Sequence, residues 1–229
     1  MIRCILFDLD GTLLDTAPDL GYALNLLRAE QRLPPLPAAA IRPLASQGAR
    51  GLLRLGFGLQ PGEEGYEPLR QRFLALYRAH LNRHTVLFDG MADVLGELAQ
   101  RALPWGIVTN KPAWLTEPLL AGMQFPIPPV CVVSGDSAAH PKPHPAPLLL
   151  ACTQSGQPPA ACLYVGDAQR DIESGRRAGM RTLAATYGYI EDGDDPRHWG
   201  ADGLIDAPRE LLAWLDGLRL GPTERACSP

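Results

Sequence analysis

The short apolar run Ile2-Arg-Cys-Ile-Leu-Phe7 stops abruptly at the polar stretch Asp8-Leu-Asp-Gly-Thr12. A continuous apolar run of this length is typical of a strand that is buried on both faces of a parallel sheet. Parallel sheets carry their ligand sites just beyond the carboxyl ends of their strands. We therefore expect a buried strand that ends in a loop bearing two carboxylates, Asp8 and Asp10.

The rest of the chain divides into a helical part and an alternating part. From residue 16 to 85 the signals are helical, and Thr16-Ala-Pro-Asp19 has the form of a capping box ahead of an amphipathic helix. Further along, strand-like segments alternate with helical ones, and these strands are expected at 104–109, 130–134, 162–166 and 181–186. Such alternation predicts an α/β fold with a doubly wound parallel sheet. We expect a core of residues 1–15 and 86–218, an inserted helical domain at 16–85, and a loose tail at 219–229.

Composition excludes several classes of protein. The chain has 229 residues and a net charge of −4, which argues against nucleic acid as its main partner. Its five cysteines include no Cys-x-x-Cys pair, so disulfides and a zinc site are not expected. No apolar run is long enough for a membrane helix, and the first residues lack the features of a signal peptide. These features predict a cytoplasmic protein that acts on a small molecule, and none of them indicates an oligomeric state.

Polar clusters follow the expected strands, and parallel-sheet geometry would bring them to one edge. The four clusters are Asp8-Leu-Asp-Gly-Thr12, Thr109-Asn-Lys111, Lys142-Pro-His-Pro145, and Gly166-Asp167 with Asp171. The only two lysines of the chain lie within them. Each cluster alone could be an ordinary turn or helix cap. Four such clusters in order, each after an expected strand, indicate a functional site.

The residue types in these clusters indicate phosphate chemistry. Three carboxylates, Asp8, Asp10 and Asp167, would repel one another and have raised pKa values unless a cation joined them. Hard oxygen ligands select Mg²⁺. With a lysine nearby and free backbone N–H groups after a glycine, the site would suit a phosphate, which a carboxylate could then attack.

The four clusters resemble the four motifs of the haloacid dehalogenase superfamily, in the phosphoglycolate phosphatase-like branch with a helical cap inserted after the first strand. The resemblance implies that Asp8 is the nucleophile that forms an aspartyl-phosphate and also binds Mg²⁺. It implies that Asp10 is the general acid and base, with its backbone carbonyl on the metal. The remaining roles that it implies are phosphoryl binding by Thr109 and the backbone N–H of Asn110, charge neutralisation by Lys142, metal ligation by Asp167, and orientation of the metal site by Asp171.

Other reactions of this superfamily can be compared residue by residue. Dehalogenases lack the second aspartate, so Asp10 favours phosphate chemistry. Phosphonatases need a lysine in the cap, and residues 16–85 contain none. A mutase like β-phosphoglucomutase shares the nucleophile and the acid and stays open, as does a generalist sugar phosphatase. A catalytically silent binding protein is a further alternative, against which the intact motif residues argue.

The substrate should be set by the cap. Its loop Ser46-Gln-Gly-Ala-Arg-Gly51 offers Gln47, Gly48 and Arg50 as substrate-binding candidates. Arg50 could pair with a carboxylate or a second phosphate, or could simply be solvated. This loop, the stretch Trp105–Pro112 and the segment Tyr187–Asp202 resemble relatives that hydrolyse N-acetylmuramic acid 6-phosphate in cell-wall recycling. Such relatives are often named phosphoglycolate phosphatases, and both substrates carry a carboxylate, so both stay open.

Two linkers would let such a cap move. They lie near Asp15–Pro18 and His84–Gly90, where the helical domain joins the core. We expect the cap to open for substrate and to close to exclude water.

Overall fold

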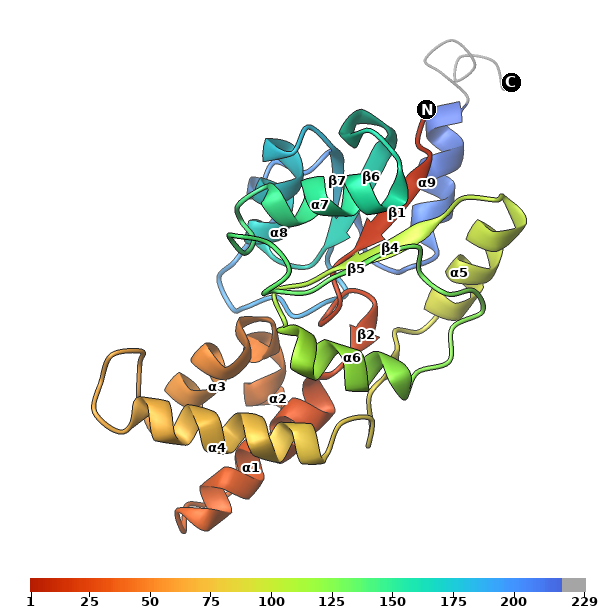
Figure 1. Ribbon diagram of the computed structural model, residues 1–229. Coiled ribbons are helices and arrows are strands. Elements are labelled where there is room, and N and C mark those ends of the chain that lie inside the picture. Colours follow the sequence, from red (N-terminus) through yellow and green to blue (C-terminus); the bar gives the residue numbers. More distant parts are fainter. Residues whose placement is uncertain (220–229) are drawn as a thin grey trace.

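A six-stranded parallel sheet forms the centre of the computed structural model, which describes residues 1–219 (Figure 1). The strands stand in the order β5-β4-β1-β6-β7-β8. They are β1 (Cys4–Phe7), β4 (Trp105–Val108), β5 (Val132–Val133), β6 (Cys162–Gly166), β7 (Arg181–Ala185) and β8 (Gly203–Ile205). The chain builds outward from β1 to β5, then returns to add β6 on the other side of β1. The predicted doubly wound α/β fold is confirmed.

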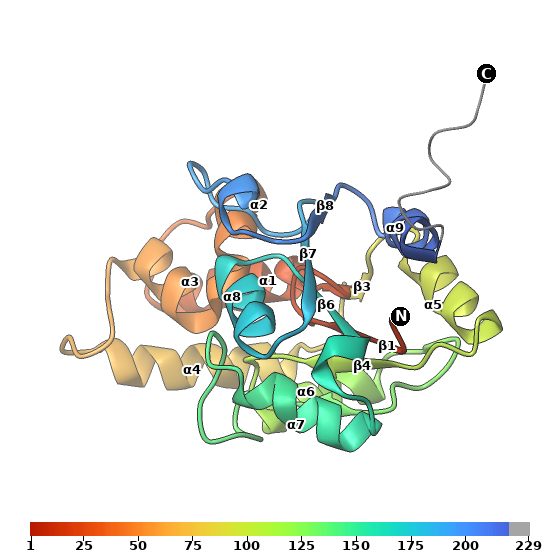
Figure 2. The same cartoon turned by 90° about the horizontal axis from the view of Figure 1, so that it is seen from above.

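Helices cover both faces of the sheet because successive side chains of a strand point to opposite faces (Figure 2). Ile5 and Phe7 of β1 join the hydrophobic cluster under α5 and α9, whereas Cys4 and Leu6 join the cluster under α7. The α8 helix packs on β6 and β7. These helices are α5 (Met91–Gln100), α7 (Ala146–Ser155), α8 (Gln169–Arg177) and α9 (Glu210–Arg219).

A separate group of helices lies beside the sheet, and we call residues 16–85, which contain it, the cap (Figure 1). It comprises α1 (Ala17–Glu30), α2 (Ala38–Ile41), the 3₁₀ turn η1 (Arg42–Gln47), α3 (Gly48–Phe57) and α4 (Tyr66–Ala79). These elements share a hydrophobic cluster of their own, with Leu24, Leu52 and Phe73 fully buried in it. Helix α6 (Ala113–Ala121) bridges the two parts, because Leu115 packs on the cap cluster and Leu119 on the core cluster.

Two short strands join the cap to the core and were not expected. Strand β2 (Leu14–Asp15) pairs antiparallel with β3 (Val86–Leu87), where the chain enters and leaves the cap. Two-residue strands carry no alternation that a sequence pattern could reveal. The three-residue β8 escaped prediction for the same reason, and the strand expected at 130–134 shrinks to Val132–Val133.

The expected capping box at Thr16 is wrong. Thr16 does precede α1, but its hydroxyl does not cap the helix and donates to Asp10 Oδ1 at 2.6 Å. Pro18 stands in the first turn and offers no N–H to a capping group. The Asp19 carboxylate instead accepts hydrogen bonds from the backbone of His84 and Thr85.

Within residues 1–219, none of the helices combines the length and the apolar character that crossing a membrane requires. The tail predicted at 219–229 falls outside the described residues, except for Arg219, with which α9 ends.

Candidate active site

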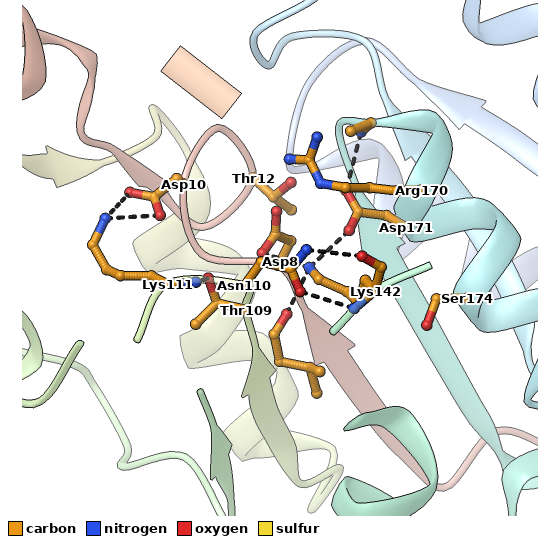
Figure 3. A network of polar contacts seen from close by, with 12 residues as sticks. Asp8, Asp10, Thr12, Thr109, Asn110, Lys111, Lys142, Arg170, Asp171 and Ser174 are labelled. Atoms are coloured by element: carbon orange, nitrogen blue, oxygen red, sulfur yellow. Dashed lines mark hydrogen bonds and ion pairs between the residues drawn. The ribbon is translucent and has the colours of Figure 1, made fainter. Parts of the chain in front are cut away.

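The four predicted clusters meet at the carboxyl edge of the sheet (Figure 3). Phe7 pairs in register with Ile107 on one side and Val165 on the other. This register sets Asp8, just after β1, beside the ends of both neighbouring strands, and the Asp8 N–H donates to Val165 O at 2.9 Å. Thr109 follows β4 and Asp167 follows β6. Strand pairing alone therefore gathers residues that are far apart in the sequence.

Lys142 is a fully buried cation at the centre of the cluster. Its Nζ lies 2.8 Å from Asp8 Oδ1 and 2.7 Å from Asp171 Oδ1, and it donates to the Tyr164 hydroxyl at 2.7 Å. Burial by itself would lower the pKa of Lys142, but the carboxylates of Asp171 and Asp8 outweigh it and the pKa is raised. Lys142 therefore stays charged and holds the Asp8 carboxylate in place.

Asn110 and Ser174 hold the loop that carries Lys142. The Asn110 side chain donates to Lys142 O at 3.0 Å and accepts from Lys142 N at 2.9 Å. From α8, the Ser174 hydroxyl donates to His144 O at 2.9 Å. The family resemblance implies a role for the backbone N–H of Asn110 alone, and no sequence pattern predicts this two-point contact of its side chain.

Three buried carboxylates form a group that could hold a metal ion. They belong to Asp8, Asp167 and Asp171, and one oxygen of each lies within 4.8 Å of the others. Burial, opposed by Lys142, raises the pKa of Asp8 to about 6, and burial with repulsion from Asp8 and Asp171 raises the pKa of Asp167 to about 7. Gly11 has φ +89°, and a Cβ there would lie 2.0 Å from Asp167 Oδ2, so only glycine lets the loop approach this closely.

The chemistry of these donors fits Mg²⁺. All are carboxylate oxygens, which that ion prefers, and their repulsion would be relieved by a divalent cation. The charge of Asp171 is already paired with Lys142 at 2.7 Å, whereas within residues 1–219 Asp167 accepts hydrogen bonds from neutral donors only. Asp8 and Asp167 are therefore the better candidates for direct ligands.

The Asp10 carboxylate stands apart from this group, contrary to the expectation that Asp8, Asp10 and Asp167 would gather. Its two oxygens lie 2.7 and 2.9 Å from Lys111 Nζ, and Thr16 donates to it as well (Figure 3). The positive charge of Lys111 stabilises the Asp10 carboxylate in this position, whereas the negative charge of Asp8 would repel it. Asp171 takes the place that was expected for Asp10.

The cap reaches into the site through Ser46. Its hydroxyl donates to Asp167 Oδ2 at 2.8 Å, and its carbonyl accepts from Arg170 Nη2 at 2.8 Å. On the core side, Thr12 and the N–H of Tyr189 also donate to Asp167, at 3.2 and 2.9 Å. Ser46 begins the cap loop with the substrate-binding candidates, and Arg170 directly precedes Asp171, but no spacing in the sequence predicts that these two residues meet.

A cavity of about 690 Å³ lies between cap and core. Asp8, Asp10, Thr109 and Asn110 line its core side. The three predicted cap residues, Gln47, Gly48 and Arg50, also line it, as do the unpredicted residues Arg54, Arg70, Arg170 and Glu191.

The three cap arginines of this cavity differ in their partners. Arg54 lies 3.9 Å from the Glu191 carboxylate, and Arg70 lies 2.9 Å from the Glu67 carboxylate. Arg50 makes no ion pair or hydrogen bond with any residue in the part of the chain that the structure describes. Arg50 is thus the cap cation whose charge is available to a ligand.

The fold and the site define an α/β enzyme with a carboxylate-rich centre beside β1 and β6, where the order of the strands reverses, beneath a helical cap. The model of the haloacid dehalogenase-like hydrolase family matches residues 5–185, and the chain belongs to that family. It is a phosphoric monoester hydrolase.

Similar proteins extend over almost the whole chain. The N-acetylmuramic acid 6-phosphate phosphatase of Pseudomonas aeruginosa is 44% identical, covering 94% of this chain and 95% of its own. A phosphoglycolate phosphatase of Xanthomonas campestris pv. campestris is 42% identical, covering 93% and 97%. Among solved structures, a predicted phosphoglycolate phosphatase from Haemophilus somnus has a TM-score of 0.79 at 26% identity and covers 93% of this chain and 98% of its own.

Proposed function

We propose that the protein is a Mg²⁺-dependent phosphatase that hydrolyses N-acetylmuramic acid 6-phosphate through an aspartyl-phosphate. The observation that carries the proposal is the position of Asp8, which lines the cavity floor, is held by Lys142, and lies within reach of a common cation with Asp167. Mg²⁺ would be held by the carboxylates of Asp8 and Asp167 and by the main-chain carbonyl of Asp10. When bound, it would supply positive charge that offsets the negative charge of substrate and nucleophile.

Asp8 is the nucleophile of the proposed reaction. One of its carboxylate oxygens bonds to phosphorus while the ester P–O bond breaks and its electron pair leaves with the sugar oxygen. Lys142 keeps Asp8 oriented and balances the charge that gathers on the phosphoryl oxygens. Thr109 and Asn110 line the cavity, and the hydroxyl of the first and the N–H of the second would bind those oxygens.

Asp10 is the proton donor and acceptor. It gives a proton to the leaving sugar oxygen, then takes one from the water that attacks the aspartyl-phosphate, which releases phosphate and restores Asp8. For both steps Asp10 has to release Lys111. Thr16, at the start of the cap, bonds to the same carboxylate, so the position of Asp10 is tied to the position of the cap.

The cavity favours a large carboxylated substrate. Pockets of about 300–1,000 Å³ usually hold ligands of drug size, and the two-carbon acid 2-phosphoglycolate would leave most of this one empty. Arg50, which has no ion-pair or hydrogen-bond partner among residues 1–219, could pair with the lactyl carboxylate of N-acetylmuramic acid. 2-Phosphoglycolate is the second candidate, supported by the names of the Xanthomonas relatives.

The cap and the cellular location complete the proposal. Residues 16–85 act as a domain that opens and closes on the linkers containing β2 and β3, over a core of residues 1–15 and 86–218. The four described cysteines are free thiols, as a reducing compartment would keep them, and on that ground we propose a cytoplasmic location.

Steady-state phosphate release with Mg²⁺ tests this function. N-acetylmuramic acid 6-phosphate and 2-phosphoglycolate are compared with N-acetylglucosamine 6-phosphate, which lacks the carboxylate. We expect kcat/KM to be highest for N-acetylmuramic acid 6-phosphate, by about tenfold or more if Arg50 pairs with its carboxylate. Equally slow phosphate release from all three compounds would refute the proposed substrate. Formation of an isomeric sugar phosphate without release of free phosphate would identify a mutase.

The Asp8→Asn variant tests the nucleophile. An amide cannot attack phosphorus, so kcat should fall by at least about 10³-fold while the fold is retained. Asp93→Asn, at an exposed position on α5 outside the cavity, is the matched control and should keep full activity. Phosphate release by Asp8→Asn at the wild-type rate would rule out the aspartyl-phosphate.

A further inference from the structure

We propose that Glu191 is a specificity residue that accepts hydrogen bonds from hydroxyl or amide N–H groups of the substrate. The enzyme would then select a hydroxylated, acylamino-bearing sugar phosphate over a small acid phosphate. This inference rests on the proposed phosphatase function and deepens it. Glu191 does not belong to any of the four motifs; it stands in the segment between β7 and β8.

Glu191 faces the same cavity as the catalytic groups. Of the residues that line this cavity in the described chain, only Asp8, Asp10 and Glu191 carry a carboxylate. In the proposed reaction Asp8 attacks phosphorus and Asp10 transfers a proton at the ester oxygen, so both act at the phosphate end of a substrate. Glu191 is the one carboxylate left for the rest of a substrate.

The contacts of Glu191 are with the cap. The Gln47 side-chain amide donates to Glu191 Oε1, and Arg54 Nη2 lies 3.9 Å from Glu191 Oε2. The Glu191 side chain keeps 38% of its surface exposed, so these contacts leave room for a ligand. Gln47 and Arg54 are replaceable partners, because each is a donor on an exposed or half-exposed side chain.

The charges of Arg50, Arg54 and Glu191 determine which ligand suits this side of the cavity. Arg50 and Arg54 are one helical turn apart on α3, so the Arg50 cation, which has no ion-pair partner in the described part of the chain, stands next to the Glu191–Arg54 pair. A ligand with a carboxylate and separate hydroxyl or N–H donors can use Arg50 for the first and Glu191 for the second. The carbon skeleton of 2-phosphoglycolate bears no such donor, and its carboxylate would be repelled by Glu191.

The alternative is that Glu191 only ties the core to the cap. The two roles differ in what they do to different substrates. If Glu191 only ties the core to the cap, replacing it changes how the cap closes and affects turnover of every substrate alike. A hydrogen-bond acceptor for sugar donors changes the affinity only for substrates that have them.

The test compares Glu191→Ala with the neighbouring exposed control Asp192→Asn, using N-acetylmuramic acid 6-phosphate and 2-phosphoglycolate. We expect Glu191→Ala to raise KM for the sugar acid about tenfold or more, with kcat within about twofold, because hydrogen bonds to a charged acceptor are lost. Its kcat/KM for 2-phosphoglycolate should stay unchanged or rise. Equal losses on both substrates, or no change on the sugar acid, would overturn the inference.

A binding measurement separates this inference from the function on which it rests. In the Asp8→Asn background, calorimetry measures the Kd of N-acetylmuramic acid 6-phosphate and of N-acetylglucosamine 6-phosphate with and without Glu191→Ala. If the wild type hydrolyses another hydroxylated sugar phosphate instead, the proposed substrate fails, yet a Glu191-dependent Kd for sugar phosphates upholds the inference. If the Kd values for both sugar phosphates are the same with and without Glu191→Ala, the inference is overturned, whatever the wild type hydrolyses.

Discussion

The charge of Lys142 joins the proposed nucleophile to the rest of the site. This one ammonium contacts two carboxylates, the Tyr164 hydroxyl and, at 3.0 Å, the carbonyl of Val108. A buried ion pair that loses one partner leaves an uncompensated charge behind, which costs far more than the pair itself contributes. Residues that hold Lys142 in position should therefore affect activity and stability almost as strongly as Lys142 itself.

Tyr164 is such a positioning residue, and Tyr164→Phe tests it. Its hydroxyl accepts from Lys142 and donates to Val108 O at 2.9 Å, from a side chain that is fully buried in β6. Removing this hydroxyl should lower kcat about tenfold with KM nearly unchanged, since Lys142 is held less firmly, and should cost about 1–3 kcal/mol of stability.

The kcat and KM values separate positioning from general destabilisation. Tyr22→Phe, in the cap and outside the cavity lining, is the matched control and should leave both constants unchanged. If Tyr164→Phe lost stability but kept the full kcat, its hydroxyl would have only a structural role.

At the scale of elements, the paired strands β2 and β3 make the joint between cap and core. Asp19, in the first turn of α1, is fully buried and ties this joint together. It accepts hydrogen bonds from His84 N at 2.9 Å, from Thr85 N at 3.0 Å, and from the Thr85 hydroxyl at 2.8 Å. One carboxylate thus accepts from three donors of the returning linker.

Asp19→Ala should therefore destabilise the protein strongly. Two backbone N–H groups and a hydroxyl lose their acceptor at once, so we expect a loss of about 2–4 kcal/mol in the free energy of unfolding. Asp19→Asn keeps one acceptor oxygen and should lose less. Urea denaturation measures both, with the exposed control Asp89→Ala; a loss for Asp19→Ala no larger than for this control would show that the joint does not depend on Asp19.

The same elements show what the sequence could and could not predict. Asp8, Thr109 and Asp167 were placed together because each follows a buried apolar strand, and the sheet topology does the rest. Thr16 was misread because a local pattern cannot reveal that a hydroxyl prefers a carboxylate six residues earlier. The contact between Ser46 and Asp167 joins residues 121 positions apart, and only the packing of the cap on the core creates it.

At the scale of the whole molecule, stability in the absence of a divalent cation should depend on pH. Asp8 and Asp167 have pKa values raised to about 6 and about 7, from 3.8 for an ordinary aspartate. Between about pH 4 and pH 7 the folded protein therefore holds protons that the unfolded chain has released. Its free energy of unfolding should fall as the pH rises through this window, because the clustered carboxylates become charged.

Mg²⁺ should reverse this loss. It binds the ionised carboxylates, so the rise in Tm that it causes should be larger at about pH 8 than at about pH 5. Thermal melts of chelator-treated protein with and without added Mg²⁺ measure this difference. Asp167→Asn removes one ionising group and should diminish the effect; a Mg²⁺-induced shift of equal size at both pH values would contradict the charge-repulsion account of the site.

Substrate access is the remaining property of the whole molecule, and it depends on the cap contacts. Ser46 and Gln47 touch the core at Asp167, Arg170 and Glu191, across the cavity that substrate must enter. A reversible cross-link between Gln47→Cys and Glu191→Cys, with Cys227→Ser to avoid side reactions, should hold this contact shut. We expect turnover to fall at least about tenfold on cross-linking and to recover on reduction, because opening must precede each substrate entry and product release. The reduced double variant is its own control, so an identical rate before and after reduction would show that substrate and product pass without movement of the cap.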